Sequence, residues 1–228
     1  MTINVTADLH GEYGRFVSLL NKLSLKKGDH LYILGDAVDR GADGIKILQL
    51  IRAHKETITL LLGNHEYMML NALSSGDFRQ IQSWMLNGGK ETMRSFLKLS
   101  VVEQQELLNW LRGLPLSARV TVGERNFYLI HGWPGESLYD VVWGRPDSLY
   151  SDPGIENATV IVGHTPVCLL ANGTMSTERY LGRLEASGDH MRILHAPHFI
   201  DVDCGCGHDV SSARLACLRL DDMAEFYV

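Results

Sequence analysis

Leu34-Gly35-Asp36-Ala37-Val38-Asp39-Arg40-Gly41 is an apolar run that stops at a glycine and continues into two carboxylates and a guanidinium. The residues that lead into it, Leu31 to Leu34, form a short apolar run typical of a buried parallel strand. Apolar residues after it recur at helical spacing from Ile45 to Ile51. Asp36, Asp39 and Arg40 are therefore expected in a loop at the carboxyl end of a strand, where open α/β sheets place their ligand sites.

The same arrangement of strand and polar turn occurs on both sides of this stretch. Upstream, Ile3, Val5 and Ala7 lead into Asp8-Leu9-His10-Gly11, and a helix is predicted from Phe16 to Leu23. Downstream, an apolar run from Ile58 to Leu62 stops at Gly63-Asn64-His65-Glu66. Two successive βαβ units would bring all three polar turns to one edge of a sheet.

The chain from Glu66 to Leu116 shows mostly helical spacing, interrupted at Ser74 to Asp77 and at Asn87 to Gly89. We predict a helical insertion over about residues 66–116 that lies beside the polar turns. Its methionines and Trp84 recur at helical spacing, which favours packing over a cofactor site.

The last third of the chain is predicted to return to strands. A hairpin from Val120 and Val122 through Gly123 to Asn126 would deliver His131, and Val160 to Val162 ends at Gly163-His164-Thr165. The tail contains three more short apolar segments: Ile200 to Val202, Leu215 to Leu220 and Phe226 to Val228. With no internal repeat or linker in view, we expect one α/β domain over residues 1–228.

The composition indicates an ordinary globular protein with a mild acidic excess. The chain has 228 residues, 45% of them hydrophobic, and a formal net charge of -6, which argues against a general nucleic-acid surface. Met1 to Thr6 lacks the features of a signal peptide, and no apolar run approaches the ~20 residues of a membrane span. Four cysteines are too few for a disulfide framework. We expect a cytoplasmic protein with no nucleic-acid or membrane partner.

The polar strand ends together supply a set of oxygen and nitrogen ligands without a thiolate. Such a set suits Mn²⁺, Fe or Zn²⁺ better than Cu(I) or an iron-sulfur cluster. Six ligands are too many for one tetrahedral ion and suit two ions that share a ligand, the arrangement that hydrolyses phosphoesters. The six candidates are Asp8, His10, Asp36, Asn64, His131 and His164.

These motifs resemble those of the phosphoprotein phosphatase family within the calcineurin-like metallophosphoesterases, especially its small bacterial and phage members. They occur in the family's order and span residues 8 to 165, with a weaker match at Asp203-Cys204-Gly205. The resemblance implies a two-sheet β-sandwich flanked by helices. It also implies a binuclear centre, with Mn²⁺ as the expected metal and Fe or Zn²⁺ as alternatives. Asp8, His10 and Asp36 would hold the first ion, and Asp36, Asn64, His131 and His164 the second.

The resemblance further implies the chemistry. A water or hydroxide that bridges the metals would attack the phosphorus in line, while His65, oriented by Asp39, protonates the leaving oxygen. Arg40 and Arg145 would grip the phosphate, because a guanidinium matches phosphate oxygens bidentately. The expected activity is hydrolysis of phosphoserine and phosphothreonine in phosphoproteins or phosphopeptides, with phosphotyrosine as a further substrate.

The sequence departs from the family pattern in three respects. Trp133 stands where a second glycine usually follows the ligand histidine, and Ala7 stands where a serine is common. The chain is also shorter than the eukaryotic catalytic domains. We therefore do not expect it to bind the regulatory subunits of those enzymes.

Other interpretations stay open at this point. Within the enzyme class, the rival activity is hydrolysis of diadenosine tetraphosphate. Outside it, the chain could be a silent metal-binding scaffold, although a scaffold has no need of a general acid. Asp39 and Arg40 could also form a plain surface ion pair.

Some residues outside the motifs invite weaker hypotheses. Cys204-Gly205-Cys206-Gly207-His208 suggests a metal site, but buried thiols at a strand end are favoured because four clear ligands are missing. Within residues 172–192, Arg179, Arg183 and Arg192 could contact substrate, but a solvated hairpin is favoured. Ordinary surface or core roles are expected for the remaining histidines: His30, His54, His190, His195, His198 and His208.

Overall fold

The computed structural model describes residues 1–170 and 190–228. The predicted hairpin with Arg179 and Arg183 lies outside these residues, whereas Arg192 is within them and exposed. No helix among the described residues is long and apolar enough to cross a membrane.

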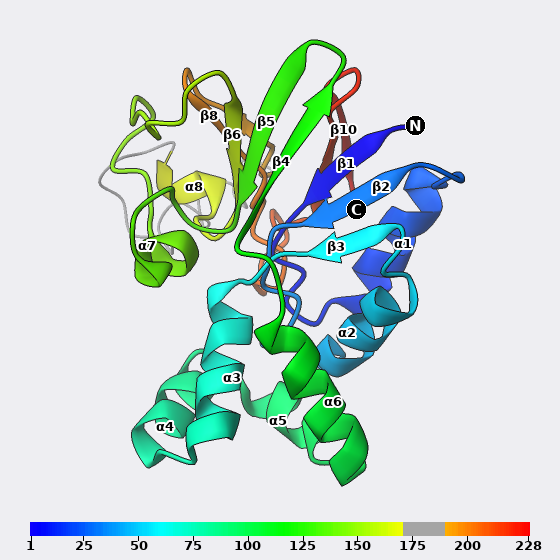
Figure 1. The fold of residues 1–228 in the computed structure, drawn as a ribbon, viewed down its shortest axis with the longest axis vertical. Helices are drawn as coiled ribbons and strands as arrows, with labels where there is room; N and C mark the ends of the chain where they lie inside the picture. Colours follow the sequence, from blue (N-terminus) through cyan, green and yellow to red (C-terminus); the bar gives the residue numbers. More distant parts are fainter. Residues whose placement is uncertain (171–189) are drawn as a thin grey trace.

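Two five-stranded mixed sheets face each other (Figure 1). In the first sheet β1, β2 and β3 are parallel, and β9 and β10 extend it antiparallel at one edge. In order, this sheet consists of β10 (Ala224–Tyr227), β9 (Ala216–Arg219), β1 (Ile3–Thr6), β2 (His30–Ile33) and β3 (Ile58–Leu60).

The second sheet has a parallel centre of β5, β6 and β8, and antiparallel strands β4 and β7 close its two edges. In order, it consists of β4 (Ser117–Val122), β5 (Arg125–Ile130), β6 (Thr159–Val162), β8 (Phe199–Asp201) and β7 (Leu194–His195). Both sheets therefore contain parallel strands whose carboxyl ends can deliver polar side chains.

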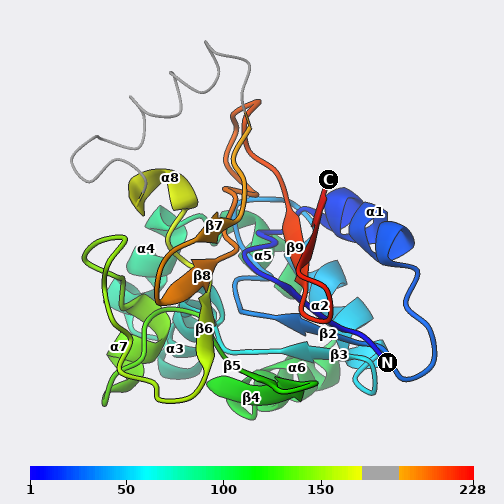
Figure 2. The same ribbon diagram turned by 90° about the horizontal axis from the view of Figure 1, so that it is seen from above.

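Helices cover the sandwich on its outer sides (Figure 2). The helices α1 (Tyr13–Leu23) and α2 (Gly44–Ala53) pack on the first sheet, and α7 (Leu138–Trp143) and α8 (Val167–Leu170) lie beside the second. A hydrophobic core that includes Val5, Leu34, Phe127 and Ile161 fills the space between the sheets. A second core joins the first sheet to its helices.

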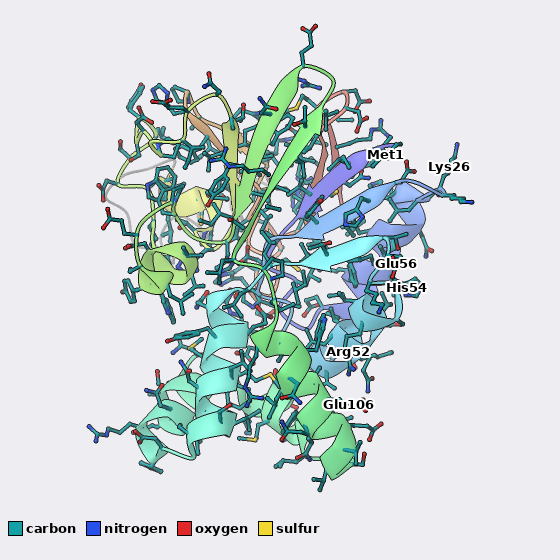
Figure 3. The ribbon with its side chains drawn as sticks, in the orientation of Figure 1. Met1, Lys26, Arg52, His54, Glu56 and Glu106 are labelled. Carbon is teal, nitrogen blue, oxygen red and sulfur yellow. The ribbon has the colours of Figure 1, made fainter. Side chains whose placement is uncertain are left out.

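Four helices lie between β3 and β4, in the part of the chain for which an insertion was predicted (Figure 1). They are α3 (Asn64–Ser75), α4 (Phe78–Leu86), α5 (Lys90–Phe96) and α6 (Val101–Arg112). An exposed ion pair, Arg52 to Glu106 at 3.7 Å, links α2 to α6 (Figure 3). Such a pair contributes less than ~1 kcal/mol, so apolar packing holds these helices in place. That the whole chain is one domain stays a prediction.

The α/β class and the two-sheet sandwich flanked by helices are confirmed. Most element ends differ from the prediction by one or two residues, which is ordinary. Two differences matter. The β4–β5 hairpin turns on Gly123 and Glu124 alone, with Val122 opposite Arg125, so the predicted four-residue turn is wrong. The helix expected from Glu66 begins at Asn64, which places Asn64 and His65 in its first turn.

Candidate metal centre

The polar turns of both sheets meet between the strand ends in an unusual backbone conformation. Asp8 and His10 follow β1, Asp36 follows β2, His131 follows β5 and His164 follows β6. Left-handed φ angles of 42° to 71° occur at six of the candidate residues, at a cost of about 1–3 kcal/mol each. Strain of this kind persists only where surrounding contacts impose it, and it is typical of functional sites. The six are Asp8, His10, Asp36, Asp39, Arg40 and His164.

Asp36 lies at the centre of the cluster. Its Oδ1 is 3.4 Å from His131 Nε2, and its Oδ2 is 3.9 Å from His10 Nε2. Two groups of ligand atoms share it, one with His10 and His65 and the other with His131 and His164. Burial alone would raise the pKa of Asp36, but His131, His65 and His10 outweigh burial and lower it. The carboxylate is therefore ionised, and its two oxygens face different histidines, Oδ1 toward His131 and Oδ2 toward His10 and His65.

Backbone carbonyls orient two of the imidazoles. The carbonyl of Val38 lies 3.2 Å from His10 Nδ1, and that of Leu34 contacts His131 Nδ1. Because a carbonyl only accepts, both Nδ1 atoms carry the proton and both Nε2 atoms present a lone pair to the cluster. Burial lowers the pKa of His10 and of His131, which favours the neutral form of both rings. Neutral imidazoles held from behind are well suited to bind a metal.

Two contacts indicate that a cation belongs here. His131 Nε2, an acceptor, faces the Oδ1 atom of Asn64, also an acceptor, at 2.9 Å. Adjacent ligands of an octahedral cation, each at about 2.1 Å, lie about 3 Å apart, so one ion would satisfy both atoms. In addition, His164 Nε2 is buried without a hydrogen-bond partner among the described residues. The donor set therefore fits a divalent metal.

Crowded carboxylates give the same indication. Asp8 is 2% exposed, its Oδ1 lies 3.8 Å from His10 Nε2, and its Oδ2 accepts from the His164 backbone N–H. Burial, Asp203 and Asp36 raise its pKa well above the usual range. A bound cation would relieve this repulsion, because it favours the ionised carboxylate.

His65 is held by Asp39 beside this cluster. Its Nδ1 donates to Asp39 Oδ2 at 2.7 Å, and its Nε2 is 3.8 Å from Asp36. Burial lowers the pKa of His65, but Asp36 and Asp39 raise it by a larger amount, so the net shift is upward. Asp39 is fully buried and also accepts from Trp84 Nε1, so the surface ion pair considered from the sequence does not describe it. Trp84 packs in the core as expected, but it also fixes this carboxylate.

The two arginines lie on different sides of the cluster. Arg40 lies near Asp8 and His10: its charge opposes the upward shift of the Asp8 pKa and adds to the effect of burial, which lowers the pKa of His10. Its Nη1 is 3.1 Å from His208 Nε2. Arg145 Nη1 is 3.1 Å from Thr165 Oγ1, next to His164. Both arginines are exposed. The structure thus brings all ten predicted residues together, and their roles stay predictions.

Glu66 belongs to the site, although no role was predicted for it from the sequence. It is fully buried, and its carboxylate accepts the backbone N–H groups of Asp36, Ala37 and Gly63 at 2.8 to 3.1 Å. Burial and Asp36 raise its pKa to about 7, against the N–H donors. Its place at the third position of a helix after Gly63, a capping position, was the available signal.

We expect Glu66→Gln to lower the free energy of unfolding by about 2 to 3 kcal/mol, because the amide replaces one accepting oxygen with an NH2 group that faces backbone N–H donors. Urea denaturation of the metal-free protein measures the change. Glu56→Gln is the matched control, since Glu56 is exposed at the start of β3 (Figure 3). Equal stability of the two variants would show that Glu66 does not hold the Asp36 turn.

The thiols lie outside the cluster. All four cysteines are free and buried, and Cys204 and Cys206 belong to no group of metal-ligand side chains within residues 1–170 and 190–228. Burial raises the pKa of Cys206 to about 12. This agrees with buried thiols at a strand end.

Comparison with known families gives one match over most of the chain. The family model of the calcineurin-like phosphoesterases matches residues 1–211. A crystal structure of a metallophosphoesterase from Sphaerobacter thermophilus has the same fold, with a TM-score of 0.59 and 18% identity over 100% of this chain and 88% of that chain.

Two curated relatives have different names. The chain is 34% identical over 136 residues to serine/threonine-protein phosphatase 2 of Escherichia coli K12, which is 58% of each chain. It is also 34% identical over 117 residues to the symmetrical bis(5'-nucleosyl)-tetraphosphatase of Erwinia tasmaniensis, 51% of this chain and 39% of the relative. The chain thus matches about two fifths to three fifths of these relatives' lengths.

Proposed function

Because the chain belongs to the calcineurin-like phosphoesterase family, we propose that it is a metal-dependent phosphomonoesterase for phosphoserine and phosphothreonine, with phosphotyrosine as a further substrate. The pair of His65 and Asp39 beside a divalent-metal ligand set is the observation that carries this proposal. A serine or threonine alkoxide is a poor leaving group, and a buried acid next to the phosphate site serves it best.

The proposed ligand sets share Asp36. Asp8 and His10 would complete the first set, and Asn64, His131 and His164 the second. When bound, two cations would bind phosphate oxygens, make water nucleophilic at neutral pH and neutralise the charge of the displacement. Mn²⁺ is the proposed metal, with Fe or Zn²⁺ as alternatives, because the ligands are oxygen and nitrogen atoms.

This chain's own residues would handle the proton and the phosphate. The Nδ1 proton of His65 is held in the hydrogen bond to Asp39, so the Nε2 proton is the one that would pass to the leaving oxygen. Arg40 and Arg145 are both exposed beside the cluster, and each can pair with phosphate oxygens and neutralise their charge. The hydrogen bond from His65 to Asp39 favours the protonated ring and raises its pKa, which suits a group that must hold a proton near neutral pH.

Hydrolysis of diadenosine tetraphosphate is the second candidate, favoured by the Erwinia tasmaniensis relative. A nucleotide leaving group is a much weaker base than an alkoxide, so it needs the acid less. The test is a panel with Mn²⁺-reconstituted protein: phosphopeptides of all three types, para-nitrophenyl phosphate and diadenosine tetraphosphate. Release of inorganic phosphate from phosphoserine peptides supports the proposal, and release of ADP without it contradicts it.

Chelation is expected to abolish the activity, and Mn²⁺ is expected to restore it. Binding to the folded state alone would also raise the free energy of unfolding by about 2.7 kcal/mol when free Mn²⁺ is a hundred times its dissociation constant. Thermal unfolding with and without Mn²⁺ measures this, with Mg²⁺ at equal ionic strength as control. An unfolding temperature that Mn²⁺ does not change would contradict the proposed ligand sets.

We also propose that the protein works in a reducing compartment, the cytoplasm. All four cysteines are free thiols, which suits such a compartment.

A further inference from the structure

The loop after β8 carries His208 to the guanidinium of Arg40. Nη1 of Arg40 lies 3.1 Å from Nε2 of His208, although 168 residues separate them in sequence. This loop is the Cys204–His208 segment that resembles a metal site in sequence. Its two cysteines are buried inside, while its histidine is partly exposed and faces the candidate phosphate ligand.

The direction of this hydrogen bond is fixed by chemistry. A guanidinium has donors only, so Nε2 of His208 must accept and Nδ1 must carry the proton. Burial and the charge of Arg40 lower the pKa of His208 to about 4, which keeps the ring neutral and able to accept. His208 therefore holds one N–H of Arg40 in a set direction without a charge of its own.

Close backbone packing fixes the loop against the metal cluster. Gly207 has φ of +82°, and a Cβ at this position would lie 2.4 Å from His10 Cβ. Only glycine permits this approach. The backbone N–H of His208 donates to Gly205 at 3.1 Å, and that of Gly205 donates to Asp203 at 2.9 Å. His208 is thus placed relative to the candidate ligand His10, and not on a free surface loop.

Arg40 lines an open cavity. The cavity has a volume of about 640 Å³, and Arg15, Arg40, Gly207 and His208 are part of its wall. The backbone N–H of Arg40 donates to Gly88 at 3.0 Å, which fixes the main chain but not the long side chain. An arginine loses about 2 kcal/mol of side-chain entropy when it is ordered, so a partner that orders it in advance aids phosphate binding.

We propose that His208 is a positioning residue that orients Arg40 toward the substrate phosphate. The proposal rests on the proposed function, because it takes Arg40 as a phosphate ligand. The Cys204–His208 segment is then a support for an arginine, and no metal binds to its thiols.

A double-mutant cycle tests the proposal. His208→Leu removes the acceptor at similar volume, and we expect the Michaelis constant for a phosphoserine peptide and the dissociation constant of inorganic phosphate to rise roughly three- to tenfold. In an Arg40→Ala background the same substitution should change both by less than about twofold, because His208 acts through Arg40. An equal loss in both backgrounds would overturn the proposal.

His208→Gln is the conservative variant, since its amide oxygen can accept the same N–H. It should keep phosphate affinity within about twofold of the wild type, and this comparison remains informative if the leucine variant folds poorly. His198→Leu, at an exposed histidine, is the matched control. Equal phosphate affinity of His208→Leu and His208→Gln would contradict the proposal.

Calorimetric phosphate binding to the Mn²⁺-loaded protein separates the two proposals. The wild-type protein could hydrolyse no phosphopeptide while the phosphate dissociation constants of the variants change as the double-mutant cycle predicts. This result would disprove the proposed substrate and leave the role of His208 intact. A fully active His208→Leu variant with unchanged phosphate affinity disproves the role of His208 and leaves the substrate intact.

Discussion

Asp36→Asn is expected to reduce the turnover of a phosphoserine peptide by about a thousandfold or more. The expected bound metals contribute several kcal/mol, and each ~1.4 kcal/mol is a factor of ten in rate. Asp36 belongs to both groups of ligand atoms, so its loss weakens both sites at once. We expect metal content per chain to fall together with kcat, and elemental analysis after gel filtration measures it.

Asparagine is the informative replacement for Asp36. The His65 backbone N–H donates to Asp36 Oδ1 at 3.0 Å, and an amide oxygen can still accept that bond. The fold should therefore survive, and the loss should be one of charge. Asp43→Asn is the control, since Asp43 is exposed just before α2. An Asp36→Asn protein with two metals per chain and wild-type kcat would refute Asp36 as the ligand that both metals share.

His65→Asn should affect substrates according to their leaving groups. For a phosphoserine peptide we expect kcat to fall by about 10² to 10³, the usual contribution of a general acid. For para-nitrophenyl phosphate, whose leaving group departs without a proton, the loss should be less than about tenfold. Steady-state kinetics on the two substrates measures the difference, and a silent scaffold has no such dependence.

The same variant decides between two roles for His65. Its ring lies close enough to His10 and Asp36 to serve as a ligand, but its Nδ1 is occupied by Asp39. If His65 is the general acid and not a ligand, its replacement should leave the metal content unchanged. Unchanged metal content with a substrate-dependent loss of kcat supports the acid, and loss of one metal with equal effects on both substrates supports a ligand. His54→Asn is the control, at an exposed position just after the end of α2 (Figure 3).

Local sequence could predict the strands and the ends that carry the site. A buried parallel strand needs a continuous apolar run, and a glycine followed by charged residues marks where the strand ends. Both features lie within a few residues of Asp36, so no tertiary information was needed. The ends of the hairpin at Gly123 were harder, because the pairing of Val122 with Arg125 depends on register between strands.

Contacts between distant segments could not be predicted from the sequence. The left-handed backbone at Asp8 and His10 depends on hydrogen bonds from their N–H groups to Gly35 and Asp36 in the neighbouring turn. Helical spacing placed Trp84 in a core, but only the packing of α4 brings its Nε1 to Asp39.

By itself, the sequence determined the α/β class and the residues that gather at the strand ends, because apolar periodicity and polar turns are local properties. Tertiary structure alone decided how those residues are held. Glu66 under the Asp36 turn and His208 on Arg40 are contacts whose two sides are far apart in the chain. Such contacts form only when the sheets and helices pack, and no periodicity within a segment encodes them.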